Sequence, residues 1–127
     1  MRYLLQVWFD GRIVEDMPPA ERAAFERDVT EYDAELKRRG HLIVARPLFP
    51  PATAVTVKVR QGRISSTDGP FAETKEHLGG FLIVEAKDRE EAVRLAAGIP
   101  LAKFGSIEVR QIATRPDAVP DDLPPGA

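Results

Sequence analysis

The chain has 127 residues, of which 43% are hydrophobic and 30% are charged, and it contains no cysteine. This size and balance predict a globular protein with one hydrophobic core, and they exclude a disordered chain. The absence of cysteine excludes disulfides, thiolate nucleophiles and thiolate metal ligands. We expect a cytoplasmic protein without a membrane segment, because the amino terminus lacks a secretion signal and the apolar runs are too short to span a bilayer.

The charge distribution separates the last residues from the rest. The formal net charge is −2, from 18 basic and 20 acidic side chains. Residues 1–113 carry 17 of each sign, and no basic stripe suggests a nucleic-acid partner. Residues 114–127 hold four prolines and three aspartates. We therefore expect one folded domain over 1–113 and a tail over 114–127 that is mobile or laid on a neighbour.

The hydrophobic periodicity predicts an alternation of strands and helices. Residues 2–9 are expected as a strand, and a helix follows that starts at Pro18 and Pro19 and ends at Gly40. A second helix begins near Asp88, which with Glu91 resembles a capping box, and ends near Gly98. The remaining expected elements are a strand at 41–48, a hairpin at 54–67, and strands at 81–86 and 106–112.

This order predicts an α+β fold with a ferredoxin-like antiparallel sheet and two helices on one face. The other face is expected to present Trp8, Ile43, Leu82 and Val84, which are more apolar than a solvated face should be. A second copy of the chain could cover it by packing sheet against sheet, so a homodimer is expected.

The densest group of polar residues lies in "TDGPFAETKEHLGG", residues 67–80. Asp68, Gly69 and Pro70 suit a tight turn, but a turn does not account for the charged residues that follow. Asp68 is a candidate general base, with Lys75 or Arg46 as a candidate for stabilising an oxyanion. The alternative is that Asp68 only ties the turn and that the neighbouring charges form a solvated cluster.

Other residues of the same region are candidates for binding a ligand. We expect a cleft rimmed by the loop 68–77 and by Arg46, which interrupts an apolar strand. The candidate ligand-binding residues are Arg46, Phe71, Glu73 and His77. The two histidines, His41 and His77, lack a diagnostic metal-binding spacing, so neither a metal nor a cofactor is expected. The pair Gly79 and Gly80 fits no phosphate-binding pattern and is expected to mark a bulge or a close backbone approach.

Residues 1–113 resemble the DGPF-domain branch of the YCII-related family. The match is carried by "TDGPFAETKEHLGGFLIVE" and supported by "RYLLQVWFD", "LKRRGHLIVARPL", "PPATAVTVKVRQGR" and "GSIEVRQI". The resemblance implies a dimeric α+β barrel. Many members of the wider family hold a histidine on the first helix and an aspartate near a cleft, and one branch removes chloride from a hydroxylated aromatic ring. Counting back from Gly40, the histidine position falls near Val29, and the family's "GPL" reads "RPL", with Arg46 in place of glycine.

Three functions follow as hypotheses. The first is a homodimeric α+β barrel that binds a small organic ligand in a cleft. The second is an enzyme of lyase or isomerase type that uses Asp68 as its base. The third is a regulatory partner of an extracytoplasmic-function sigma factor, since the resemblance implies that the DGPF branch is often encoded beside such factors.

Overall fold

The computed structural model describes residues 1–114. The strands are β1 Arg2–Phe9, β2 Leu42–Pro47, β3 Val55–Arg60, β4 Arg63–Asp68, β5 His77–Glu85 and β6 Ser106–Gln111. The helices are α1 Gly11–Glu15, α2 Pro19–Arg38 and α3 Arg89–Ala97, with short 3-10 turns η1 Pro51–Thr53 and η2 Pro100–Lys103. The predicted long helix, short helix, hairpin and flanking strands are all confirmed. The expected tail lies outside the described residues except for Thr114.

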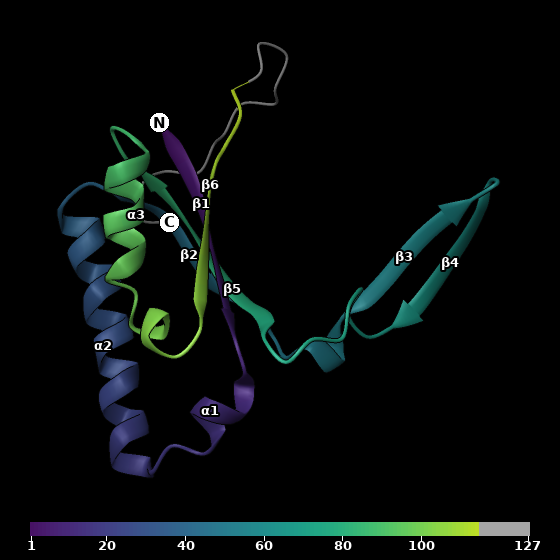
Figure 1. The fold of residues 1–127 in the computed structure, drawn as a ribbon, viewed down its shortest axis with the longest axis horizontal. Helices are drawn as coiled ribbons and strands as arrows, with labels where there is room; N and C mark the ends of the chain where they lie inside the picture. The colour runs from purple at the N-terminus through teal and green to yellow at the C-terminus, as the bar shows by residue number, and fades with distance from the viewer. Residues whose placement is uncertain (115–127) are drawn as a thin grey trace.

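Four strands form one antiparallel sheet in the order β2-β5-β1-β6, and β3 and β4 form a separate two-stranded sheet. Helices α2 and α3 both lie on one side of the larger sheet (Figure 1). This is the ferredoxin-like α+β arrangement that the sequence predicts. Among the described helices, none is long and apolar enough to cross a membrane.

The core lies between the sheet and the helices α2 and α3. Leu5 of β1, Leu36 of α2 and Val84 of β5 are its most deeply buried large side chains. Burying a side chain of this size contributes roughly 1.5–3 kcal/mol. The side chains that α3 and the residues just after it bury in this core are Ala92, Leu95, Ala96 and Ile99.

Local capping explains where the helices begin. The Asp88 carboxylate accepts a hydrogen bond from the Glu91 amide at 2.8 Å, as the expected cap requires. The Glu91 carboxylate accepts from the Lys87 amide at 3.0 Å. The second hydrogen bond of the capping box therefore comes from the residue before Asp88. The residues "DGR" at 10–12, which follow β1, predict a turn. The segment is instead the one-turn helix α1, because the Asp10 carboxylate accepts from the Arg12 amide at its amino end.

The register of the sheet shows that the face expected for Leu82 and Val84 was wrong. The register pairs Tyr3 with Val84 and Leu5 with Leu82, so Leu82 and Val84 lie on the helix-covered face and not on the other one. Ile43 lies in a register shift of β2 and is buried. Of the four residues expected on the second face, Trp8 lies there. The side chains that share this face in β1 and β5 are Leu4, Gln6, Trp8, Phe81 and Ile83.

Candidate ligand-binding site

A cleft opens between α2, the end of the sheet and η2, on the helix-covered side. Its volume is about 240 Å³ and its walls are mainly apolar. Val29, Tyr32 and Asp33 reach it from α2, and Arg46 lines it from β2. The cleft is therefore built by the helix and the sheet together, with few polar groups on its walls.

Asp33 is the polar residue that distinguishes this cleft. Its side chain is half-buried on α2, and burial raises the pKa of the Asp33 carboxyl above its ordinary value. A carboxyl with a raised pKa holds its proton at a higher pH and serves better as an acid, a base or a hydrogen-bonding group. The sequence contains the signal for it, because Asp33 lies four residues after Val29 and three before Leu36. It is a charge on the apolar stripe of the helix, and our sequence reasoning missed it.

Tyr32 holds one wall of the cleft in place. Its hydroxyl donates to the carbonyl of Leu95 at 2.6 Å, which links α2 to α3. Burial raises the pKa of Tyr32, and the nearby Glu35 carboxylate adds to the effect. The ring lies over Gly98, where an added Cβ would come within 2.3 Å of the Tyr32 hydroxyl oxygen. Glycine at this position therefore leaves room for the tyrosine.

Arg46 is the sequence-predicted candidate that lines this cleft. Its guanidinium donates to the carbonyl of Ala45 at 2.8 Å, and the side chain is exposed at the rim. The adjoining glycines, Gly79 and Gly80, have the close contacts expected of them. A Cβ on Gly79 would lie 2.0 Å from the Phe9 ring, and one on Gly80 would lie 2.9 Å from the Arg46 carbonyl oxygen. The register shift in β1 and β5 also falls at Gly79.

The loop between β4 and β5 lines a second hollow, which is separate from the cleft. This apolar groove of about 570 Å³ is lined by Trp8, Phe49, Phe71, His77 and Leu78, among others. The predicted ligand-binding residues Phe71 and His77 therefore lie apart from Arg46, in a second hollow. Glu73, Asp68 and Lys75 line neither hollow. The structure thus brings together only some of the residues that the sequence grouped.

The DGP turn fastens the root of the hairpin. The Gly69 amide donates to the Ala54 carbonyl at 2.7 Å, and the Thr56 hydroxyl donates to the Gly69 carbonyl at 2.9 Å. Gly69 has a φ of +105°, a conformation that favours glycine. The Lys58 ammonium lies 5.8 Å from the centre of the Phe71 ring. Asp68 ends β4 with an exposed side chain next to this turn.

Lys75 acts near a different acid, Asp10. The pKa of Asp10 is lowered to about 2, mainly by the hydrogen bond from the Arg12 side chain and with a smaller contribution from the charge of Lys75. Glu76 accepts from the Ser106 hydroxyl at 3.2 Å. The Glu76 contact joins the loop to β6, and the charge of Lys75 acts on the carboxylate at the amino end of α1.

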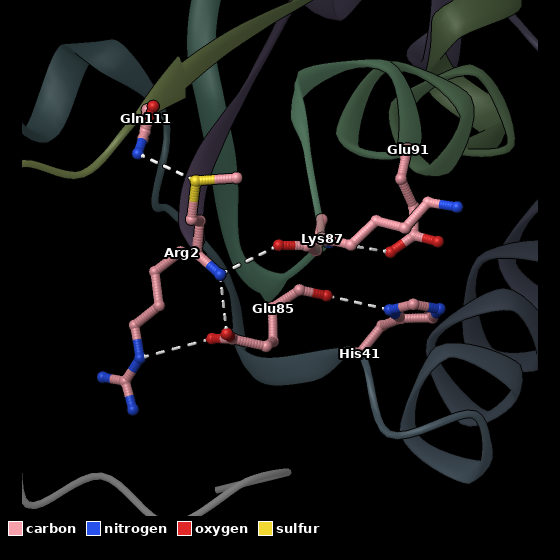
Figure 2. Close-up of polar contacts among 8 residues, drawn as sticks. Arg2, His41, Glu85, Lys87, Glu91 and Gln111 are labelled. Carbon is pink, nitrogen blue, oxygen red and sulfur yellow. Dashed lines mark hydrogen bonds and ion pairs between the residues drawn. The ribbon is translucent and has the colours of Figure 1, made fainter.

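The two histidines lie at opposite ends of β5. His77 begins the strand and packs its ring against Phe9, with 5.0 Å between the ring centres. Its Nδ1 is buried and has no hydrogen-bond partner in the described residues. The His41 ring contacts the carbonyl of Glu85 at 2.8 Å, where Figure 2 shows it beside the polar group around Glu85. The eight residue-to-residue steps from His77 to Glu85 correspond to roughly 25 Å. Within residues 1–114, no three potential metal ligands gather.

The polar group in Figure 2 is structural. The amino-terminal ammonium of Met1 donates to the Glu85 carboxylate at 2.8 Å and to the Ala86 carbonyl at 2.9 Å. Arg2 lies 3.8 Å from the same carboxylate. These contacts tie β1 to β5 at the end of the sheet remote from His77, and they contribute nothing to either hollow.

Comparison with known proteins places the chain in a family. The model of the YCII-related domain matches residues 1–115. The chain belongs to the YCII-related family. An uncharacterised protein of Rhizobium meliloti (strain 1021) is 30% identical over 115 residues, which cover 89% of this chain and 93% of that protein. The family expected from the sequence is therefore confirmed.

A solved structure supports the fold. It is that of 5-chloro-2-hydroxyhydroquinone dehydrochlorinase from Burkholderia phenoliruptrix AC1100, in complex with 2,5-dihydroxybenzoquinone. The two chains align with a TM-score of 0.54 over 89% of this chain and 94% of that one, at 18% identity. At this identity the likeness shows a common α+β fold and leaves the activity of this chain open.

Proposed function

We propose that this YCII-related protein binds a small organic molecule, a single ring with polar substituents, in the cleft between α2 and the sheet. The observation that carries the proposal is Asp33, a half-buried carboxyl on the wall of an otherwise mainly apolar cleft. A mainly apolar pocket with a few polar groups is the usual form of a small-molecule site.

The size of the cleft limits the ligand. A cavity of roughly 150 Å³ accommodates benzene, and this cleft has a volume of about 240 Å³. One substituted ring therefore fits, and a dinucleotide does not. The ligand of the structurally similar dehydrochlorinase, 2,5-dihydroxybenzoquinone, is of this class.

The polar groups suggest how such a ring would be oriented. Asp33 would accept a hydrogen bond from a ring hydroxyl on the helix side of the cleft. Arg46 at the rim would donate to an oxygen on the other side of the ring. The Tyr32 ring would pack against the ligand while its hydroxyl stays bonded to Leu95.

An enzyme is the second candidate, and the raised pKa of Asp33 favours it. Burial makes the carboxyl a better proton acceptor, which suits a general base acting on a ring hydroxyl. Val29, where the resemblance places the family's histidine, lines the same cleft. In this chain a valine thus stands where the family's histidine would be, and Asp33 would act without an imidazole.

Two expectations from the sequence stay predictions. Asp68 as a base, with Lys75 as its partner, would require a ligand outside both hollows. A sigma-factor partner is supported neither by the comparisons nor by a feature of the described residues.

Titration calorimetry with 2,5-dihydroxybenzoquinone and simple dihydroxybenzenes tests the proposal. We expect saturable binding by the wild type and at least tenfold weaker binding by Asp33→Asn, since tenfold corresponds to about 1.4 kcal/mol. Asp28→Asn is the matched control, because Asp28 lies on the same helix and does not line this cleft. Equal affinities of the two variants, or no saturable binding of any of these rings, would contradict it.

We also propose that the protein forms a homodimer that pairs through the second face of the sheet. Within residues 1–114, the helices α2 and α3 lie on the opposite side of the sheet (Figure 1), so neither covers Leu4, Trp8, Phe81 and Ile83 on that face. A second copy would bury these half-exposed apolar side chains, as the family resemblance also implies. Light scattering is expected to give twice the mass of the chain, and a monomer at micromolar concentration would contradict the pairing.

A further inference from the structure

The hairpin β3–β4 stands away from the rest of the protein. It leads off on the side of the sheet opposite to the helices (Figure 1). It forms its own two-stranded sheet and is not hydrogen-bonded into the larger one. An isolated two-stranded hairpin is at best marginally stable in water. The hairpin therefore needs a surface to pack on.

The two faces of the hairpin differ sharply in chemistry. The pairing places Val55, Val57, Val59 and Ile64 on one face, because side chains alternate along each strand. Ser66 and Asp68, which pair with Val57 and Val55, lie on the same face toward the root of the hairpin. Their exposed fractions are 58%, 61%, 56% and 78%. The opposite face carries Thr56, Lys58, Arg60, Arg63, Ser65 and Thr67. The apolar face is the one without a cover, since the DGP turn and Phe71 approach the polar one through Thr56 and Lys58.

The exposed apolar face is large for so short an element. Its four side chains present on the order of 300 Å² of apolar surface. Monomeric proteins seldom expose contiguous apolar patches beyond a few hundred Å² unless the patch binds something. A standard protein interface takes roughly 800 Å² from each partner. The hairpin face could supply more than a third of that area, and the second face of the sheet could supply the remainder.

We propose that the hairpin is a dimer arm, whose apolar face of Val55, Val57, Val59 and Ile64 packs against a second copy of this chain. The proposal rests on the homodimer proposed above. It adds that the arm, and not only the sheet, holds the two copies together.

A second copy fits this position better than solvent or an unrelated chain. The arm projects from the same side of the sheet as the uncovered face, so a copy seated on that face lies alongside it. Each strand of the arm has six residues and spans roughly 20 Å, so the arm can extend over the surface of a neighbouring copy. A two-fold axis uses both arms at once, each on the other copy. The basic face, with Lys58, Arg60 and Arg63, would remain in water.

The apolar groove lies at the root of the arm, and a dimer held by the arms would change it. Trp8 belongs both to the uncovered sheet face and to the groove, and Ala54 and Phe71 line the groove beside the hairpin. A second copy held by the arms would cover the open side of this groove. The groove would then be a closed hollow in the dimer, incomplete in one copy.

A pair of lysine substitutions tests the arm. Val57→Lys places a charge on the apolar face, and Thr67→Lys places the same charge on the polar face of the same hairpin. We expect sedimentation to show at least a tenfold weaker dimer for Val57→Lys and a native dimer for Thr67→Lys. Trp8 is the sole tryptophan, so its emission reports the uncovered face directly. It should shift to the red in Val57→Lys and remain unchanged in Thr67→Lys.

A photo-crosslink identifies what the arm touches. Because the chain has no cysteine, Val57→Cys carries a benzophenone maleimide at one site only. Crosslinked dimers attached at residues outside the hairpin would support the proposal. A wild-type monomer would overturn both the homodimer and the arm. A dimer that keeps its affinity in Val57→Lys, that is weakened equally by both lysines, or that gives no crosslink would overturn the arm and leave the homodimer standing.

Discussion

The two faces of the four-stranded sheet are built from neighbouring residues and meet different surroundings. On the covered face, Tyr3, Leu5 and Val7 are almost fully buried by the helices. On the second face, Leu4 and Trp8 from the same strand are half-exposed, with Phe81 and Ile83 beside them. One face completes a core within the chain, and the other has the composition of a core without a cover.

The second face is not uniform, and this locates the contact. Along β6 it carries Glu108 and Arg110, which form an ion pair at 3.4 Å. Exposed ion pairs of this kind are normally solvated. The apolar part lies over β1 and β5, toward the side where the hairpin leaves. The difference between the faces therefore indicates a partner over the middle of the sheet, and not over its β6 edge.

The largest expected effect comes from comparing two adjacent leucines, Leu5 on the covered face and Leu4 on the second face. Leu5→Ala should cost about 2–5 kcal/mol of unfolding free energy, because it opens a cavity in the core. Leu4→Ala should cost only about 1 kcal/mol in the dissociated chain, because Leu4 is half-exposed there. Urea unfolding at protein concentrations below dimer dissociation measures both. Equal losses would mean that the second face is already packed within the chain.

Much of the fold was predictable because local signals suffice for it. The periodicity of α2, the Asp88 cap and the alternation of β3 each specify an element without reference to the rest of the chain. The faces of β5 were not predictable, because "FLIV" is apolar at every position and carries no alternation. Only the pairing with β1, shifted at Gly79, assigns Leu82 and Val84 to the covered face.

The candidate site was predicted less well for a related reason. The loop 68–77 attracted attention through its composition, but its contacts fasten the hairpin and the end of the sheet. The cleft depends on how α2 packs over the sheet, which no local pattern shows. Asp33 was visible as a charge on an apolar helix face, yet its importance follows only from the cleft that it lines.

A smaller effect is expected where the two covering helices meet. Tyr32→Phe removes the hydroxyl that donates to Leu95 and should cost about 0.5–1.5 kcal/mol of unfolding free energy. The cost should fall at the low end, because the Leu95 carbonyl also accepts from the Gly98 amide at 3.3 Å. Chemical denaturation measures it. A variant as stable as the wild type would show that the helices need only apolar packing to cover the sheet.

The smallest effect concerns the acid on the covered side, and its sign depends on pH. Because burial raises the pKa of Asp33, the folded chain holds this proton at pH values where the unfolded chain has lost it. Wild-type stability should therefore fall, relative to Asp33→Asn, as the pH rises from the ordinary aspartate value of about 3.9 through the raised one. Urea unfolding between pH 3.5 and 7 measures the difference, with Asp28→Asn as the control on the same helix. A difference that is constant across this range, or that grows toward acid, would mean that the carboxyl is solvated in the folded chain. The cleft would then lack the buried acid on which its proposed chemistry depends.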